Sequence, residues 1–388
     1  MSEWEFVAYE SLAAPEKSAF SMGPFGSKLT QRDYRDSGVP LTRGINLTKG
    51  IFHDSDFVYI SPEKADELPS ANVRPGDLVF THRGTIGQVS MIPRNPRFRR
   101  YVICSSQVKT RLDQSKAIPE FYYYWFQSPK GQHSILENSS TVGVPGIATP
   151  LTSIRKLQVP RPPLVTQKAI AAILGALDDK IAVNDRIAAT SRQILETLSQ
   201  SITTRKSRQV ELREIVELHY GKALKTSDRT PGKVPIFGGN GISGSHNRPL
   251  VSGPGIIIGR KGANAGSVSW SNCDFWPIDT AFYVTPKRST LPMEFLFLLL
   301  QKTPLRDEVG DSAIPGLNRD IALSTKVWIP EVEAAIELAQ QARPHFKLQD
   351  QMEEENRTLA ELRDTLLPKL MSGRVRIRDA EKVVEDAV

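Results

Sequence analysis

The chain contains one series of short motifs twice, and this repetition limits its architecture more than any other feature of the sequence. Val39-Pro40-Leu41 recurs as Val234-Pro235-Ile236, and Val144-Pro145-Gly146-Ile147 recurs as Ile314-Pro315-Gly316-Leu317. Residues 76–80 followed by residues 83–87 correspond in the same way to residues 255–259 followed by residues 261–266. The matches keep their order, which makes chance agreement between Gly- and Pro-rich loops the weaker explanation. We expect two related domains, each followed by a helical segment.

Short apolar runs inside each repeat predict buried strands, because Gly and Pro bound them on both sides. These runs are residues 78–80, 102–104, 256–258 and 281–284. Residues 119–127 and 292–301 predict helices in matching places, each with a proline at its first turn. Each repeat is therefore expected to be a mixed α/β domain with long loops.

The segment between the repeats has the spacing of a coiled-coil seam. Core positions alternate four and three residues apart without interruption, which predicts a helix roughly 50 Å long at about 1.5 Å per residue. These positions are Ile170, Leu174, Leu177, Ile181, Asn184, Ala188, Ser191, Leu195, Leu198 and Ile202.

A second seam of the same kind occupies the C-terminal segment and ends at Pro368. Its positions are Leu348, Met352, Glu355, Leu359, Leu362 and Leu366. Pro344 is expected to break or kink any helix that starts near Val332. Polar residues at or beside the seams, Asn184 and Asn356, are of the kind that fixes register at some cost in stability.

Two similar helices after two similar domains favour pairing of the helices with each other, although each could instead pack on its own domain. An antiparallel pair would place the domains at opposite ends, related by a pseudo-two-fold axis. The expected pairing residues are Leu177, Ile181, Asn184, Leu195, Leu198, Met352, Leu359, Leu362 and Leu366. The predicted domains are residues 1–163 and 208–330, and the predicted helical segments are residues 164–207 and 331–388.

The net charge of +7 is concentrated in the two repeats. Residues 1–163 carry 20 basic and 15 acidic side chains, and residues 208–330 carry 15 and 11, whereas residues 331–388 carry 9 and 13. This distribution suits a polyanionic partner. The two cysteines, Cys104 and Cys273, form no zinc motif, and no apolar run is long enough to span a bilayer. We expect a cytoplasmic protein without a membrane partner.

No catalytic constellation is recognised in the sequence. Gly239, Gly241 and Gly244 fit a dinucleotide fingerprint, but no helix start follows them. The six histidines show no metal-binding or triad spacing, so we predict no catalytic residue and no metal site. Acidic residues among 62–67 resemble a nuclease cluster only loosely, and a solvated loop is the favoured interpretation.

Three stretches carry a specific resemblance. Residues 159–164 (Val-Pro-Arg-Pro-Pro-Leu), followed by residues 167–170 and 177–184, look like the central conserved region of type I restriction-modification specificity subunits. Residues 366–373 (Leu-Leu-Pro-Lys-Leu-Met-Ser-Gly) look like their closing conserved region. Residues 259–262 and 275–280 are similar to parts of their target-recognition domains. The start of the second helical segment departs from the pattern, since Glu331-Val332-Glu333 replaces the usual proline-rich entry.

The resemblance implies a non-catalytic DNA-binding subunit that directs DNA methylation and restriction. Each domain would read one half of a bipartite double-stranded DNA target, and the helices would set the spacer. The helices would also dock methyltransferase subunits, and motor-nuclease subunits would complete the assembly. S-adenosylmethionine, ATP and Mg²⁺ are expected on those partner subunits, with no cofactor in this chain.

Candidate DNA contacts follow from groove chemistry, because Arg and Lys pair with guanine, Asn with adenine, and backbone amides near Gly with phosphate. The candidates are Arg83, Gly84, Thr85, Arg97, Arg99, Arg100, Ser140, Asn240, His246, Arg260, Lys261, Asn264 and Ser312. For each of them, a solvated surface position or a folding turn is the competing interpretation.

Two other classes of function are kept open. The chain could be a non-catalytic coiled-coil scaffold that presents two protein-binding modules, in which case the basic charge is incidental. It could also be a stand-alone nuclease or methyltransferase. Steep salt dependence of binding to duplex DNA would favour DNA recognition over the scaffold.

Overall fold

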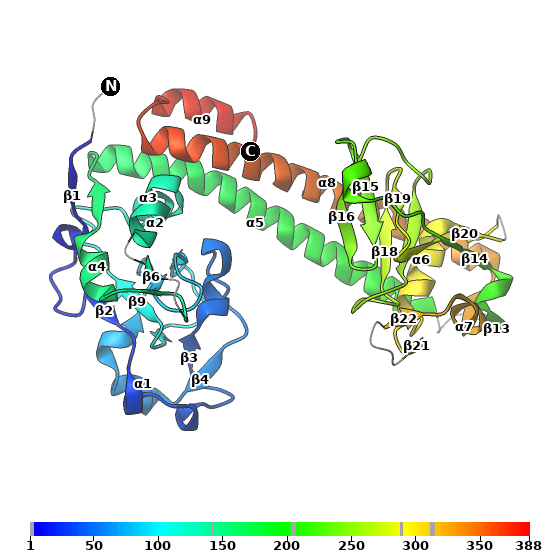
Figure 1. Cartoon of the computed structure of the whole chain (residues 1–388), viewed down its shortest axis with the longest axis horizontal. Helices are drawn as coiled ribbons and strands as arrows, with labels where there is room; N and C mark the ends of the chain where they lie inside the picture. The colour runs from blue at the N-terminus through cyan, green and yellow to red at the C-terminus, as the bar shows by residue number, and fades with distance from the viewer. Residues whose placement is uncertain (1–3, 138, 141–142, 203–206, 288–289, 311–314) are drawn as a thin grey trace. The chain divides into compact units, whose positions relative to one another are not determined.

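The computed structural model describes residues 4–137, 139–140, 143–202, 207–287, 290–310 and 315–388. The chain divides into two compact units. Unit 1 comprises Met1–Ile181 and Thr358–Val388, and unit 2 comprises Ala182–Arg357. Each unit holds one repeat and part of both long helices (Figure 1).

The first repeat, in unit 1, is built on two four-stranded sheets. One has the antiparallel order β2-β9-β6-β7, and the other has the order β4-β3-β8-β5, in which β3 and β8 are parallel. Two further pairs, β1-β12 and β10-β11, are antiparallel. The strands are β1(Phe6–Ala8), β2(Phe20–Met22), β3(Val39–Thr42), β4(Val58–Ile60), β5(Asn72–Val73), β6(Leu78–Thr81), β7(Val89–Met91), β8(Tyr101–Ile103), β9(Gln107–Thr110), β10(Ser139–Ser140), β11(Gly146–Ile147) and β12(Gln158–Pro160).

The second repeat, in unit 2, has the same strand order, except that no strand among its described residues corresponds to β5. Its antiparallel sheet has the order β14-β20-β17-β18, and its smaller sheet has the order β16-β15-β19, with β15 and β19 parallel. The pairs β13-β23 and β21-β22 complete it. The strands are β13(Ser207–Glu211), β14(Val216–Tyr220), β15(Val234–Gly238), β16(Gly241–His246), β17(Gly255–Gly259), β18(Val268–Ser271), β19(Trp276–Pro277), β20(Ala281–Pro286), β21(Val309–Gly310), β22(Gly316–Leu317) and β23(Lys326–Pro330).

The helices complete both repeats. Those of unit 1 are α1(Pro62–Asp66), α2(Pro119–Gln127), α3(Pro129–Leu136), α4(Pro150–Lys156) and α9(Ile377–Glu385), and those of unit 2 are α6(Met293–Lys302) and α7(Arg319–Ser324). The long helices α5(Leu164–Ser201) and α8(Val332–Met371) extend through both units. Among the described residues, no helix combines the length and apolar character that a membrane crossing requires.

The predicted duplication is confirmed by the matching strand orders of the two repeats. Strand β6 lies between two cores, because Leu78 and Phe80 pack into one apolar cluster and Val79 into another. Its counterpart β17 does the same with Ile256 and Ile258 on one side and Ile257 on the other. A strand buried on both faces needs apolar side chains at every position, which explains the continuous apolar runs.

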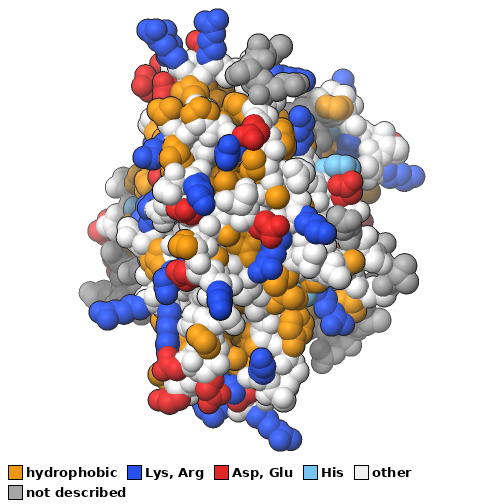
Figure 2. All heavy atoms as spheres, turned by 90° about the vertical axis from the view of Figure 1, so that its left-hand side faces the viewer, with side chains coloured by type: hydrophobic (Ala, Val, Ile, Leu, Met, Phe, Trp, Pro, Cys, Tyr) orange, Lys and Arg blue, Asp and Glu red, His pale blue; other side chains and the backbone are white. Residues whose placement is uncertain are grey.

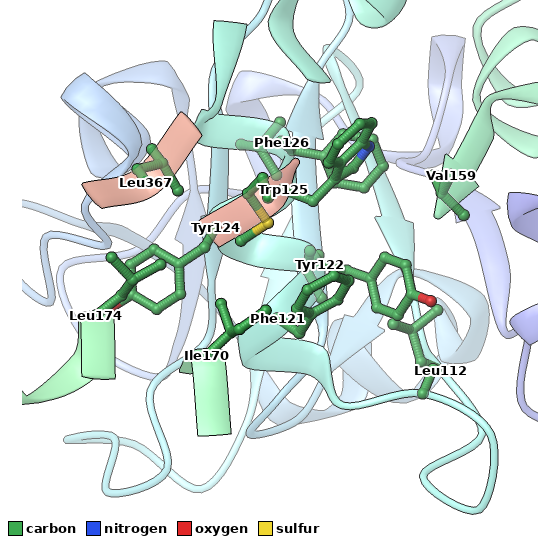
Figure 3. Packing of buried hydrophobic residues seen from close by; sticks show 14 of the residues in the cluster. Leu112, Phe121, Tyr122, Tyr124, Trp125, Phe126, Val159, Ile170, Leu174 and Leu367 are labelled. Carbon is green, nitrogen blue, oxygen red and sulfur yellow. The ribbon is translucent and has the colours of Figure 1, made fainter. Parts of the chain in front are cut away.

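Most of the α5 seam is buried as its spacing predicts, and Ile181 and Leu198 are half-buried. Figure 3 shows Leu174 beside Tyr124 and Ile170 beside Phe121, both on α2, and Leu367 of α8 belongs to the same core of unit 1. In unit 2, Leu195 and Ile202 join a cluster with α8 residues such as Leu338. The helices therefore pack both on the repeats and on each other.

Polar contacts between α5 and α8 give the direction of pairing. In unit 1, Arg363 Nη1 lies 2.7 Å from Asp178 Oδ1. In unit 2, Asn356 Nδ2 donates to Asp185 Oδ1 at 2.8 Å, and Ser191 Oγ donates to the His345 carbonyl at 3.2 Å. In unit 2, residue numbers fall along α8 as they rise along α5, so the helices are antiparallel there, and the contact in unit 1 continues the same order. The separation of the repeats at opposite ends, and the domain limits, stay predictions.

The expectation that Pro344 breaks or kinks the second long helix is wrong about the break, because α8 continues through Pro344. The helix also continues past Pro368, where the predicted seam ends. Pro344 is exposed, so the carbonyl of Gln340 that loses its donor also lies on the solvent side. On the opposite face, Ala339, Ala342 and Phe346 are buried in the core of unit 2. This packing stabilises the helix across the missing hydrogen bond.

Asn184 gives a first test of the seam. It is only 1% exposed, and its Nδ2 has no hydrogen-bond partner among the described residues. Asn184→Leu is therefore expected to raise the free energy of unfolding of unit 2 by about 1–3 kcal/mol, the usual cost of a buried unpaired donor. Urea unfolding measures the change. Gln193→Leu, at an exposed position of the same helix, is the control, and equal effects in both variants would contradict the prediction.

Candidate nucleic-acid interface

The loop at residues 83–85 and its counterpart at residues 261–264 make equivalent backbone contacts in the two repeats. Gly84 N donates to the Pro145 carbonyl at 2.8 Å, and Gly262 N donates to the Pro315 carbonyl at 2.9 Å. Isolated β-bridges join Arg83 to Gly146 and Lys261 to Gly316. In both repeats, the loop after the central strand therefore lies against the Pro-Gly loop.

Glycine is required at the centre of these loops. Gly84 has a φ of 88° and Gly262 a φ of 98°, a region that side chains with a Cβ rarely adopt. The turn leaves Arg83, Thr85, Lys261 and Asn264 exposed. Within the described part of the chain, neither Arg83 nor Lys261 forms an ion pair, so both cations are open to an external anion.

Arg260 lies beside Lys261 but is anchored within the repeat. Its guanidinium carbon is 4.8 Å from the centroid of the Tyr220 ring and 5.8 Å from that of Phe282. Its Nη1 donates to the Asp279 carbonyl at 2.8 Å. The side chain is thus held in one place with further N–H groups available.

The basic run at residues 94–100 is partly neutralised by its own domain. Arg94 forms an ion pair with Glu120, and Arg100 Nη1 lies 2.6 Å from Asp66 Oδ1. Arg97 and Arg99 are exposed, and the guanidinium of Arg97 lies over the ring of Phe98. The structure therefore leaves Arg97 and Arg99 accessible while tying Arg100 to α1.

The remaining candidates occupy different environments. His246 is buried, and its Nδ1 accepts a hydrogen bond from Thr230 N at 3.0 Å, as part of the fold. Asn240 is exposed at the turn between β15 and β16, and Ser140 is exposed on β10. Ser312 lies outside the described residues.

Charge is mixed on the face that Figure 2 shows, where Lys and Arg side chains alternate with acidic and apolar ones. Net charge alone therefore does not mark an interface there.

Two exposed residues that sequence reasoning missed, Tyr220 and Arg319, lie with Arg260 and Lys261 around one hollow. The only available signal was that Arg319 follows the repeated Gly316-Leu317 motif by two residues.

Glu63 and Asp66 lie on the short helix α1 rather than in the expected loop, because Ser61 caps its first turn, and Glu67 follows directly after the helix. Asp66 and Glu67 are paired with Arg100 and Lys64. In the part of the chain that is described, no three His, Cys, Asp or Glu side chains are grouped in a way that could hold a metal ion. Cys104 and Cys273 are free thiols.

The fold and these loops define a duplicated α/β protein whose two repeats are linked by paired long helices. The family model for the type I restriction modification DNA specificity domain matches residues 42–190 and 205–362, well over half of the chain. The chain belongs to this family.

Individual relatives agree with the family assignment. The type I restriction enzyme EcoprrI specificity subunit of Escherichia coli is 29% identical over 136 residues, which are 33% of this chain and 33% of that protein. A second curated protein, from Methanocaldococcus jannaschii, is 26% identical over 164 residues, 41% of this chain and 38% of its own length. The matched region thus spans well under half the length of these relatives. For the fold, the type I restriction-modification S subunit from M. genitalium superposes with a TM-score of 0.66 at 18% identity, covering 95% of this chain and 96% of that one.

Proposed function

We propose that this chain reads a divided DNA sequence, with one half-site bound by each repeat, as the specificity subunit of a type I restriction-modification complex. The observation that carries the proposal is the duplicated loop pair, in which Arg83 and Lys261 occupy equivalent β-bridges of the two repeats. Two equivalent basic loops suit two half-sites.

The chemistry of the loops supports DNA as the ligand. Arg83 and Lys261 are exposed cations beside glycine amides, a combination that serves both base edges and phosphates. Thr85, Asn240 and Asn264 add exposed hydrogen-bonding side chains of the kind that read bases. The scaffold alternative gives no reason for a cationic side chain to be presented at the equivalent position of both repeats.

Docking of methyltransferase subunits on the helices is supported by an apolar stripe on α5. Val183, Ile187 and Ile194 are each 36–40% exposed, although they lie at helical spacing. With Leu348 and His345 of α8 they line a hollow of about 300 Å³ in unit 2. An exposed stripe of this kind fits the apolar face of a partner helix.

In this proposal the chain supplies recognition and its partners supply chemistry. S-adenosylmethionine would bind to the methyltransferase subunits, and ATP and Mg²⁺ to the motor-nuclease subunits. The purified chain is expected to bind duplex DNA without methylating or cutting it, and addition of the methyltransferase subunits should give site-specific methylation. Methylation or cleavage that follows the chain's concentration through purification would contradict the proposal. Binding to duplex DNA without salt dependence would support the scaffold instead.

The contact loops have their own test. Arg83→Ala and Lys261→Ala are expected to weaken DNA binding by about 1–3 kcal/mol if the side chain reads a base, with relaxed preference at one position of one half-site. If the side chain contacts phosphate, all sequences should weaken alike. Titration of a library of duplexes measures both effects, and Lys130→Ala, an exposed lysine on α3, is the control. Unchanged binding in both loop variants would remove these loops from the interface.

A further inference from the structure

The second repeat contains a hollow of about 300 Å³ whose lining includes three cationic side chains, Arg260, Lys261 and Arg319, and the ring of Tyr220. We call these four residues the cation pocket. Asp320 is the acidic side chain on its lining, and its Oδ1 lies 3.8 Å from Arg319 Nε. The lining therefore keeps an excess of positive charge.

Both guanidinium groups of the cation pocket are held over one aromatic ring. The guanidinium carbon of Arg260 is 4.8 Å from the Tyr220 centroid, and that of Arg319 is 5.4 Å from the same centroid. The negative face of an aromatic ring attracts such cations. The backbone carbonyl of Asp279 fixes Arg260 further. Two like charges are thereby gathered during folding, before any ligand arrives.

The first repeat does not reproduce this arrangement. Met22 pairs with Val108 as Tyr220 pairs with Phe282. The carbonyl of His82 accepts from Ile147 N as that of Arg260 accepts from Leu317 N. Met22 and His82 are thus the counterparts of Tyr220 and Arg260.

His82 is not a substitute for Arg260. It is buried, burial lowers its pKa, and its Nε2 bonds to the Ser105 carbonyl at 3.0 Å. Thr149 follows Ile147 at the distance at which Arg319 follows Leu317. Of the counterparts of the three cations, only Arg83 is a permanent cation.

We propose that the cation pocket binds a backbone phosphate of the DNA next to the half-site of the second repeat. The inference rests on the proposed function and extends it to a named contact. Guanidinium groups match phosphate oxygens with paired N–H donors, and fixed cations suit a ligand group that is the same in every sequence. The second repeat therefore provides more of the salt-dependent affinity than the first.

The test uses the full chain, a labelled random-sequence duplex and a series of salt concentrations. Loss of one phosphate contact lowers the slope of log affinity against log salt by about 0.9 in magnitude. Arg319→Gln and Arg260→Gln should each show this decrease and bind roughly tenfold more weakly at low salt, as expected for a lost charge-assisted bond. Arg319→Lys should keep the slope. Arg208→Gln, on β13 and outside the pocket, should match the wild type.

The outcomes separate the two proposals. Unchanged slopes in both pocket variants, with a wild-type chain that binds duplex DNA, would overturn the phosphate contact alone. A wild-type chain that binds no duplex at any salt concentration would overturn the proposed function. A third measurement is the binding of inorganic phosphate to the chain by calorimetry. Binding that Arg319→Gln abolishes, without any change in the DNA slope, would assign the pocket to a free anion. Circular dichroism of each variant verifies that it is folded.

Discussion

Four residues inserted at one level of both long helices are expected to lengthen the spacer between the two half-sites by one or two base pairs. Four residues add about 6 Å of helix, and one base pair rises about 3.4 Å. The insertion points are between Ile181 and Ala188 in α5 and beside Asn356 in α8, since Asp185 and Asn356 are in contact across the pair. Because no recognition loop changes, each half-site should stay the same.

The number of inserted residues provides the control. At about 100° per residue, four residues turn the following seam by about 40°, which coiled coils tolerate, whereas two residues turn it by about 200°. The two-residue insertion should therefore turn the seam of each helix away from its partner beyond the insertion and abolish methylation. The measurement is the methylated site, mapped across the genome in cells that carry the variant with its partner subunits. Methylation at the original spacing would show that the helices do not set it, and altered half-sites would show that the repeats do not read independently.

The long helices and the duplication could be predicted from the sequence because each leaves a periodic record. A seam that alternates four and three residues from Ile170 to Ile202 fits only a helix with one buried side. Strand β6 was predictable for a similar reason, since both of its faces are buried and every residue from Leu78 to Phe80 is apolar.

Strand β9 was missed because three of its four buried residues are polar. Gln107, Lys109 and Thr110 are all buried, so neither an apolar run nor an alternation marks the strand. Its counterpart β20 has Phe282 and Val284 at the places of Val108 and Thr110 and was predicted. The periodicity of a sequence records burial only where burial selects apolar side chains.

The cation pocket was beyond sequence reasoning for a different reason. Arg260 and Lys261 follow β17, Tyr220 ends β14, and Arg319 begins α7, so only the tertiary fold brings them together. Conversely, the basic run at residues 94–100 suggested a DNA contact by composition, yet Arg100 pairs with Asp66. Charge counts do not reveal which cations the fold uses for itself.

Lys109 of β9 is a buried amine whose charge is destabilised by its surroundings. Its side chain is 1% exposed, and its Nζ donates to the Asn72 carbonyl at 2.8 Å. Burial, with the nearby Arg111 as a smaller cause, lowers the pKa of Lys109 to about 8, although Asp77 and Glu16 act in the opposite direction. The folded chain therefore carries a charged buried amine at neutral pH.

The stability of unit 1 is expected to rise with pH because of this lysine. Between pH 8 and the ordinary lysine pKa near 10.5, the unfolded chain holds a proton that the folded chain has released, so raising the pH favours folding. At about 1.4 kcal/mol per pKa unit, the rise approaches about 3 kcal/mol. Lys109→Met removes the titrating group while keeping the length of the side chain, so its unfolding free energy should lack this rise.

The measurement is urea unfolding of the wild-type chain and Lys109→Met from pH 7 to pH 10.5, compared as a difference so that all other titrating groups cancel. The difference should move by about 3 kcal/mol in favour of the wild type as the pH increases. Lys130→Met, at an exposed lysine of the same unit, should show no such change. A difference that stays constant with pH would mean that Lys109 keeps its ordinary pKa, and that the Asn72 carbonyl and the acidic groups near β9 fully compensate its burial.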